Sequence, residues 1–339
     1  MIHASAPGRG GIIGNPSDMY GGTVVSCAIT ERAEAVVSPS PLLILEVYGH
    51  FQPITSEADL QPQPGLEYLD IAKAIWRFLR RSEYATRGLL DPAATFAVRA
   101  QSTIPLRAGC AGSTAMLIVI LAAILRHLEV HCERHELAEL ARRIERHELG
   151  VMCGYQDQYM VIFGGCNAVD TRGKADHGEG REAPYASVEP LAADLEDLPF
   201  ILANTGIQRH SGQFHARPRR DWENGDPRRV AGFERIGELG RLGKKALLQR
   251  DWEWLGELMN ENHALTEELI GCGEENARLI EAARRHGALG AKLSGAGRGG
   301  TIIALHEDPD WLGAKLLEEG AERLIRLFPG PGLTVRKMR

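Results

Sequence analysis

The chain has 339 residues, of which 44% are hydrophobic and 25% charged, a composition typical of a globular protein long enough for two domains. Its net charge of -6 argues against a nucleic-acid-binding surface, and its longest apolar run, residues 115–125, is too short to cross a bilayer. We therefore expect no membrane and no nucleic-acid partner. The six cysteines form no CxxC pair, so we expect free thiols in a reducing cytoplasm.

Short apolar runs between Gly, Pro and polar residues predict strands in the first 50 residues. These runs are residues 10–14, 23–29, 33–38 and 42–49. Helical spacing of apolar residues predicts helices at 66–81 and 134–147. Between them, residues 95–102 alternate like a strand, and a Gly-rich turn leads into a long apolar helix.

The second half continues the mixture of helices and strands. The polar segment 170–184 is interpreted as a surface loop or a domain hinge, and residues 200–206 as a buried strand. Two or three helices fill 229–286, and residues 288–306 have the pattern of a strand, a glycine loop and a strand. A helix from about 309 to 326 and a last strand at 333–337 complete an α+β pattern in two halves.

Two Gly-rich turns are candidate ligand loops. Gly109 and Gly112 come just before a helix that starts with Ser113 and Thr114, so backbone N–H groups could hold a phosphate there. The alternative is a structural turn with a hydroxyl N-cap. The turn at 294–300 has four glycines between two strands and is either a ligand loop or a flexible hairpin.

Two carboxylates lie on either side of a glycine-punctuated connection. Glu145 is late in the helix expected at 134–147, and Asp157 follows Gly154. Such a pair suits phosphoryl transfer, because one carboxylate can hold Mg²⁺ and the other can accept a proton from the attacking hydroxyl. The alternative is a solvated glutamate and an N-cap aspartate.

Four stretches resemble, in order, the motifs of the GHMP kinase superfamily. They are "APGRGGIIGNPSDMYGG" (6–22), "PLRAGCAGSTA" (105–115), "GVMCGYQDQY" (150–159) and "KLSGAGRGG" (292–300). The segments 14–26 and 211–226 are similar to glucuronokinases, and "GYQDQY" is similar to heptose-phosphate kinases. The resemblance implies a two-domain α+β fold, with an N-terminal domain over 1–190, a ferredoxin-like C-terminal domain over 191–339, and the active site in the cleft between them.

The resemblance also implies roles for individual residues. Asp157 and Arg9 would be catalytic, and Ser113 and Glu145 would bind Mg²⁺, with Glu148 as the alternative to Glu145. The ATP phosphates would lie on Gly109, Cys110, Ala111, Gly112, Ser113 and Thr114. The substrate would contact Asn15, Ser17, Asp18, Gly154, Tyr159, Arg209, His215, Arg219, Gly295, Ala296, Gly297 and Arg298.

The reaction implied is the Mg·ATP-dependent phosphorylation of the anomeric hydroxyl of a sugar, with D-glucuronate as the expected substrate. The alternatives are a 1-kinase of a sugar phosphate such as a heptose 7-phosphate, and a non-catalytic sugar or ATP sensor. The arginines of 209–220 could bind a carboxylate or a phosphate, or form a solvated basic loop. Arg298, where many members have glycine, has three interpretations: backbone strain, solvent exposure, or contact with an anion.

Overall fold

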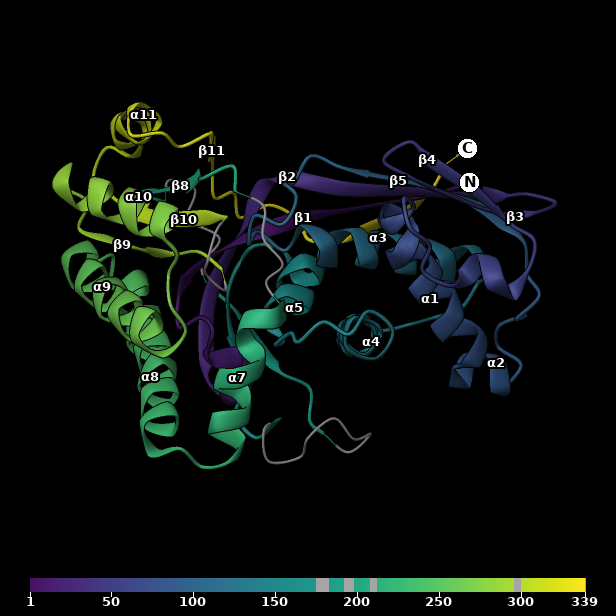
Figure 1. Cartoon of the computed structure of the whole chain (residues 1–339), viewed down its shortest axis with the longest axis horizontal. Helices are drawn as coiled ribbons and strands as arrows, with labels where there is room; N and C mark the ends of the chain where they lie inside the picture. The colour runs from purple at the N-terminus through teal and green to yellow at the C-terminus, as the bar shows by residue number, and fades with distance from the viewer. Residues whose placement is uncertain (175–182, 192–197, 208–211, 296–299, 339) are drawn as a thin grey trace.

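The computed structural model describes residues 1–174, 183–191, 198–207, 212–295 and 300–338. Within these ranges the chain forms two sheets, an eight-stranded one built mainly from the first half and a four-stranded one from the second (Figure 1). Helices pack against both sheets, in agreement with the α+β pattern expected from the sequence.

The first sheet has the strand order β12-β1-β2-β5-β3-β4, and β6 pairs with β2 and β7. Its strands are β1 (Ile2–Ile13), β2 (Thr23–Pro39), β3 (Leu43–Val47), β4 (His50–Ile54), β5 (Phe96–Ser102), β6 (Cys166–Asp170), β7 (Ser187–Pro190) and β12 (Thr334–Lys337). The strands expected at 23–29 and 33–38 are one strand, because the residues between them continue the pairing of β2 with β1 through Pro7 and Arg32.

The helices of the first half form a layer over this sheet, in which some contact its strands and the others pack on those helices. They are α1 (Asp70–Arg81), α2 (Glu83–Thr86), α3 (Gly112–His127), α4 (Arg134–His147) and α5 (Gln156–Phe163). Short 3-10 turns lie at η1 (Ser17–Tyr20), η2 (Glu57–Leu60) and η3 (Glu67–Leu69). Helix α3 is apolar on nearly all sides because it lies between the sheet and three other helices.

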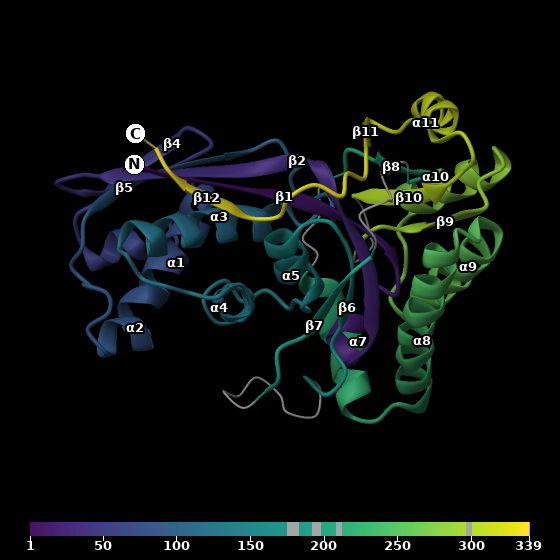
Figure 2. The ribbon, with the colours of Figure 1, turned by 180° about the vertical axis from the view of Figure 1, so that it is seen from behind.

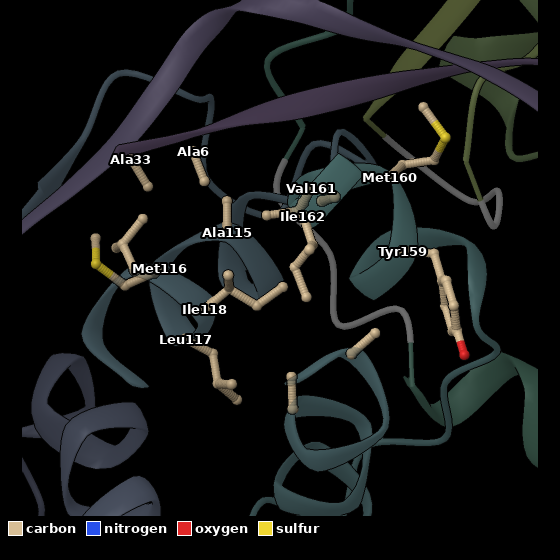
Figure 3. Packing of buried hydrophobic residues seen from close by; sticks show 14 of the residues in the cluster. Ala6, Ala33, Ala115, Met116, Leu117, Ile118, Tyr159, Met160, Val161 and Ile162 are labelled. Carbon is tan, nitrogen blue, oxygen red and sulfur yellow. The ribbon is translucent and has the colours of Figure 1, made fainter. Parts of the chain in front are cut away.

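Small side chains bring α3 close to the sheet. Ala6 of β1 and Ala33 of β2 are cross-strand partners, and both point toward Ala115 and Met116 of α3 (Figure 3). All four side chains are almost fully buried. The start of α3 is therefore held firmly against β1, which places the turn before it next to the strand that carries Arg9.

The second sheet is antiparallel with the order β11-β8-β10-β9. Its strands are β8 (Phe200–Asn204), β9 (Gly290–Leu293), β10 (Thr301–Leu305) and β11 (Arg323–Ile325). The helices of this half are α7 (Gly212–Glu223), α8 (Pro227–Gln249), α9 (Trp252–Leu269), α10 (Glu274–Arg285) and α11 (Pro309–Glu318). Helices α8 and α9 also contact β2 and β1, so they join the two halves.

The C-terminal end differs from the sequence expectation in two ways. The helix expected to reach 326 ends at Glu318, because Gly320 has a φ of +92°, and residues 323–325 then pair with β8. The last strand, β12, pairs with β1, so the chain returns to the first sheet and both termini lie together (Figure 2). In the described ranges, no helix combines the length and apolar character that crossing a membrane requires.

Candidate functional site

A cavity of about 100 Å³ lies where β1, α3, α5 and the second half of the chain meet. Four separate stretches of sequence contribute to its walls. They are Arg9, Asn15, Pro16, Asp18 and Met19; Ser113 and Thr114; Glu145, Val151, Met152, Cys153, Gly154, Gln156 and Asp157; and Gly295. Nine of the residues predicted from the sequence are thus brought together: Arg9, Asn15, Asp18, Ser113, Thr114, Glu145, Gly154, Asp157 and Gly295.

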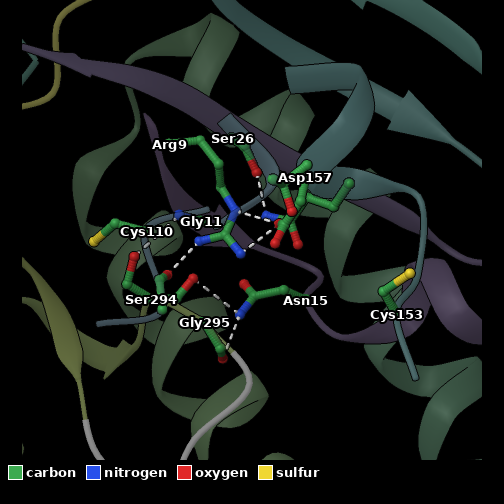
Figure 4. Close-up of polar contacts among 12 residues, drawn as sticks. Arg9, Gly11, Asn15, Ser26, Cys110, Cys153, Asp157, Ser294 and Gly295 are labelled. Carbon is green, nitrogen blue, oxygen red and sulfur yellow. Dashed lines mark hydrogen bonds and ion pairs between the residues drawn. The ribbon is translucent and has the colours of Figure 1, made fainter. Parts of the chain in front are cut away.

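Arg9 and Asp157 form a hydrogen-bonded ion pair at one wall of the cavity. The guanidinium donates through Nε (2.8 Å) and Nη2 (2.6 Å) to Oδ1 of Asp157, and through Nη1 to the carbonyl of Gly109 (Figure 4). The Arg9 side chain is 6% exposed, whereas that of Asp157 is 32% exposed. The carboxylate is therefore held in one orientation while one side of it still faces the cavity.

Asp18 fixes the helix that carries Asp157. Its Oδ2 accepts hydrogen bonds from the backbone N–H groups of Tyr155 (2.7 Å) and Gln156 (2.9 Å) at the start of α5. A Cβ on Gly154 would lie 1.9 Å from that oxygen, so only glycine leaves room for this contact. Burial raises the pKa of Asp18, and the two backbone hydrogen bonds oppose that rise.

Glu145 also lines the cavity. It is 3% exposed, and Thr114 donates to its Oε1 at 2.6 Å while Gln158 donates to Oε2. Burial raises the pKa of Glu145 to about 7, because the charged form is poorly solvated there. Glu148, the alternative considered from the sequence, instead forms ion pairs with Arg77 and Arg81.

The turn before α3 contains two residues in the left-handed backbone conformation. Gly109 has a φ of +73° and Ala111 a φ of +60°, both in the left-handed region. The carbonyls of Gly109 and Cys110 accept hydrogen bonds from the side chain and backbone of Arg9, respectively. The first N–H groups of α3, starting at Gly112, have no intrahelical acceptor and can bind an anion.

Gly295 lies directly against this turn. A Cβ at Gly295 would be 2.7 Å from the carbonyl oxygen of Gly109, which is closer than a Cβ atom normally approaches a backbone oxygen. The amide of Asn15 faces the carbonyls of Leu293, Ser294 and Gly295 at 3.3–3.4 Å (Figure 4). Asn15 is predicted to bind a sugar hydroxyl, and in the structure its side-chain amide contacts groups of the protein.

Three other predicted substrate residues do not reach the cavity. The hydroxyl of Ser17 faces the carbonyl of Thr23, and that of Tyr159 donates to Glu139 at 2.7 Å and accepts from the backbone of Ala186. Arg219 donates to the carbonyl of Met19 and to Glu223. These side chains have partners within the fold and do not line the cavity, and their role as substrate contacts stays a prediction.

Arg219 and its neighbours support η1 from outside. Its guanidinium lies 4.7 Å from the ring centre of Trp222 and 5.7 Å from that of Tyr20, and the Tyr20 ring stacks on Phe233 at 3.6 Å. Helix α7 therefore packs against the turn that contains Asp18. Arg219 therefore contributes packing in addition to charge.

Some predicted site residues fall outside the described part of the chain. They are Arg209, Ala296, Gly297 and Arg298. His215 lies within α7, and its side chain is likewise outside what the structure describes.

Sequence reasoning missed the two glutamines that flank Asp157. Gln156 lines the cavity and donates to the hydroxyl of Ser26, and Gln158 donates to Glu145. In "GYQDQY" they stand directly before and after Asp157. That position beside the predicted base could have marked them as candidate site residues. Because α5 begins at Gln156, these side chains point to different partners around the first turn.

The donor set suits a magnesium-bound nucleotide. Glu145, Thr114 and Ser113 offer a carboxylate and two hydroxyls, the hard oxygen ligands that Mg²⁺ prefers. Gly109 and Gly295 leave the backbone bare beside them, and the N-terminus of α3 favours negative charge.

Family models and curated relatives match both halves of the chain. A family model described as GHMP kinases N terminal domain matches residues 70–165, and one described as GHMP kinases C terminal matches residues 244–313. Galactokinase of Thermococcus kodakarensis is 29% identical over 353 residues, which cover 96% of this chain and 94% of that protein. Glucuronokinase 1 of Arabidopsis thaliana is 28% identical over 333 residues, covering 92% and 86%.

The fold also matches solved structures. The D-glycero-D-manno-heptose 1-phosphate kinase of Bacteroides thetaiotaomicron superposes with a TM-score of 0.73 at 21% identity, over 100% of both chains.

Proposed function

The chain belongs to the GHMP kinase superfamily, and on that premise we propose that it transfers the γ-phosphoryl group of ATP to the anomeric hydroxyl of D-glucuronate. Kinases of this superfamily use ATP as the phosphate donor. The observation that carries the proposal is the meeting, in one cavity, of the Arg9–Asp157 pair with Glu145 and the start of α3. That combination supplies a base, a cation for the transferring group, and an anion-binding helix end.

In the proposed reaction, the anomeric oxygen attacks the γ-phosphorus as the bond from that phosphorus to the bridging β–γ oxygen breaks. Asp157 accepts the proton of the anomeric hydroxyl or orients that hydroxyl for attack. Arg9 holds Asp157 in place, and its guanidinium stabilises the negative charge of the transferring group. Magnesium bound by Glu145 and the α3 hydroxyls would neutralise charge on the nucleotide phosphates.

The choice of acceptor is supported by sequence relatives. Glucuronokinase 1 of A. thaliana aligns over nearly the whole chain, and the segments 14–26 and 211–226 resemble glucuronokinases. Among the described residues of 211–226, Arg219 donates hydrogen bonds to the carbonyl of Met19 and to the carboxylate of Glu223. We therefore infer that a C6 carboxylate is recognised by other residues, with Arg209 and Arg298 as the first to test.

The test is ADP release with Mg·ATP against free sugars, uronic acids and sugar phosphates, with phosphorus NMR on any product. Turnover with D-glucuronate and an anomeric phosphate resonance would support the proposal. Turnover only with a heptose 7-phosphate would keep the reaction and replace the acceptor. Tight ATP binding without turnover on any acceptor would favour a sensor.

Asp157→Asn tests the base. The amide keeps the size of the side chain and one acceptor for Arg9, but it cannot take a proton, so we expect kcat to fall roughly 10²–10⁴-fold. Asp170→Asn, on β6 away from the cavity, is the matched control and should turn over normally. Near-normal turnover of Asp157→Asn would contradict the proposed role.

A further inference from the structure

Lys292 is a buried lysine whose contacts lead to the candidate site. It lies on β9, is 1% exposed, and donates from Nζ to Oδ1 of Asn15 and to the carbonyl of Leu293, each at 2.6 Å. Within the described ranges, no carboxylate lies at ion-pair distance from this ammonium group. A buried charge without a counter-ion is costly, so its retention calls for a physical reason.

The contact with Lys292 sets the direction of the Asn15 side chain. An asparagine amide has an acceptor on one side and donors on the other, so donation to Oδ1 turns Nδ2 toward the backbone carbonyls of residues 293–295. Nearby, Asn262 of α9 accepts from the N–H of Gly14 at 2.8 Å and donates to the carbonyl of Asn15 at 3.2 Å. The turn at 14–16 is thus fixed to the second half of the chain from two sides.

This link ends at the surface where nucleotide phosphates are proposed to bind. Gly295, the last carbonyl that Asn15 contacts, is in backbone contact with Gly109 in the turn before α3. Lys292 is therefore linked, through Asn15, to the 293–295 segment that lies against that turn. Removing the lysine would free the Asn15 amide to rotate and loosen one wall of the cavity.

The charges facing Lys292 are unfavourable to it in the free protein. From β1 the Arg9 guanidinium repels it. The His263 ring of α9, whose pKa is lowered to about 4 by burial and by the charges of Arg284 and Lys292, is neutral near pH 7 and adds no charge. Burial, followed by repulsion from Arg9, lowers the pKa of Lys292 to about 7. A phosphate bound beside Gly109 and Arg9 would offset this repulsion and favour the charged lysine.

We propose that Lys292 is a positioning residue that joins the 14–16 turn to the 293–295 segment through Asn15, and that its amine takes a proton from solvent when nucleotide phosphates bind. The inference rests on the proposed function only in requiring that the cavity binds a nucleotide. It does not depend on which acceptor is phosphorylated.

The experiment is titration calorimetry of the full chain with Mg·ADP between pH 6 and 8.5, in two buffers of different ionisation enthalpy. The difference between buffers reports protons taken up on binding, and we expect Lys292 to contribute up to about half a proton at pH 7. Protons exchanged by Glu145 on metal binding are common to all variants. They cancel when each variant is compared with the wild-type protein.

Two variants isolate the lysine. Lys292→Met removes the charge and the donors at similar length, and we expect it to remain folded, to bind Mg·ADP roughly 10–100-fold more weakly at pH 6.5, and to lose this proton uptake. Asn15→Asp places a carboxylate against Nζ, which keeps the lysine charged with or without nucleotide, so the same proton uptake is lost although the lysine remains. Lys315→Met, on the surface of α11 beside Glu318, is the matched control.

The outcomes separate the inference from the proposed function. If the wild-type chain binds no Mg·ADP, the proposed function fails and the inference fails with it. If the wild-type chain binds Mg·ADP and both variants keep its affinity and proton uptake, only the inference is overturned. A loss of affinity equal at every pH, with unchanged proton uptake, would leave Lys292 a merely structural residue and also overturn the proposal.

Discussion

Ser113 and Thr114 are neighbours at the start of α3, but their side chains have different surroundings. Ser113 is exposed, whereas Thr114 is 3% exposed and donates to Glu145. The sequence resemblance assigned the metal to Ser113 together with Glu145. The hydroxyl that orients the Glu145 carboxylate is that of Thr114, and we expect it to contribute more to metal binding than a freely rotating serine.

Substituting each hydroxyl separately tests this difference. Thr114→Val keeps the shape of the side chain and removes the bond to Glu145, so we expect the Mg²⁺ concentration for half-maximal activity to rise roughly 10–100-fold. Ser113→Ala should raise it less. A larger effect from Ser113→Ala, measured in the same Mg²⁺ titration of ADP release, would restore the original assignment.

His263 predicts a pH dependence of stability. Burial, followed by the positive charges of Arg284 and Lys292, lowers its pKa to about 4, whereas the unfolded chain protonates a histidine near pH 6.5. Between these values the unfolded state binds more protons than the folded state. The free energy of unfolding therefore falls as the pH decreases from 6.5 to 4, by about 2–3 kcal/mol from this residue.

Urea unfolding of His263→Gln across that pH range measures the contribution. The free energy of unfolding of the variant should fall less than that of the wild-type chain as the pH decreases from 6.5 to 4. Above pH 7 the two free energies should change with pH in the same way. His131→Gln, at an exposed histidine, is the control for the substitution itself. Parallel pH curves for His263→Gln and the wild-type chain would show that the buried ring is not responsible.

At the scale of elements, the position of α5 determines where Asp157 lies. Asp18 caps its first N–H groups. The Arg142 guanidinium and the Lys174 ammonium lie 3.8 Å and 4.5 Å from the centre of the Tyr155 ring, which precedes the helix. The start of α5 is thus fixed by side chains from other parts of the chain. A helix of only eight residues needs such support, because short helices are unstable by themselves.

Gly154→Ala should disturb this support. The new Cβ would displace the carboxylate of Asp18, and we expect a loss of about 1–2 kcal/mol in the free energy of unfolding and a lower kcat. In an Asp18→Ala background the collision is absent, so the same substitution should cost much less. Equal costs in the two backgrounds, measured by urea unfolding, would argue against this explanation.

At the scale of the whole molecule, the candidate site is the junction of its two halves. Gly14 and Asn15 contact Asn262 and Lys292, Gly11 donates to the hydroxyl of Ser294, and Gly295 lies against Gly109. Any ligand between the 109–112 turn and the 293–295 segment must touch both halves. Nucleotide binding should therefore depend on how closely the two segments approach.

Gly295→Ala changes that approach without entering either core. Its Cβ would meet the carbonyl of Gly109 and force the segments apart, so we expect the KM for ATP to rise roughly 10–100-fold. The melting temperature should change little, because the contact lies at the edge of the cavity. An unchanged KM for ATP would mean that the two segments can separate without affecting the nucleotide.

The sequence by itself determined the elements whose signal is local. The apolar spacing of 134–147 predicted α4 with its observed bounds, and the glycine and hydroxyl pattern predicted the turn before α3. Motif order was enough to select Arg9, Asp157 and Glu145, which the fold brings to one cavity. These signals are readable because periodicity and turn chemistry depend on neighbouring residues.

Tertiary structure decided what each side chain contacts. Tyr159 and Arg219 are residue types suited to a sugar site. In the structure Tyr159 is hydrogen-bonded to Glu139, and Arg219 to Met19 and Glu223, so neither lines the cavity. The return of β12 to the first sheet and the contact of Lys292 with Asn15 join residues more than 270 positions apart. Such contacts depend on how packed elements approach one another, and no local pattern in the chain encodes that approach.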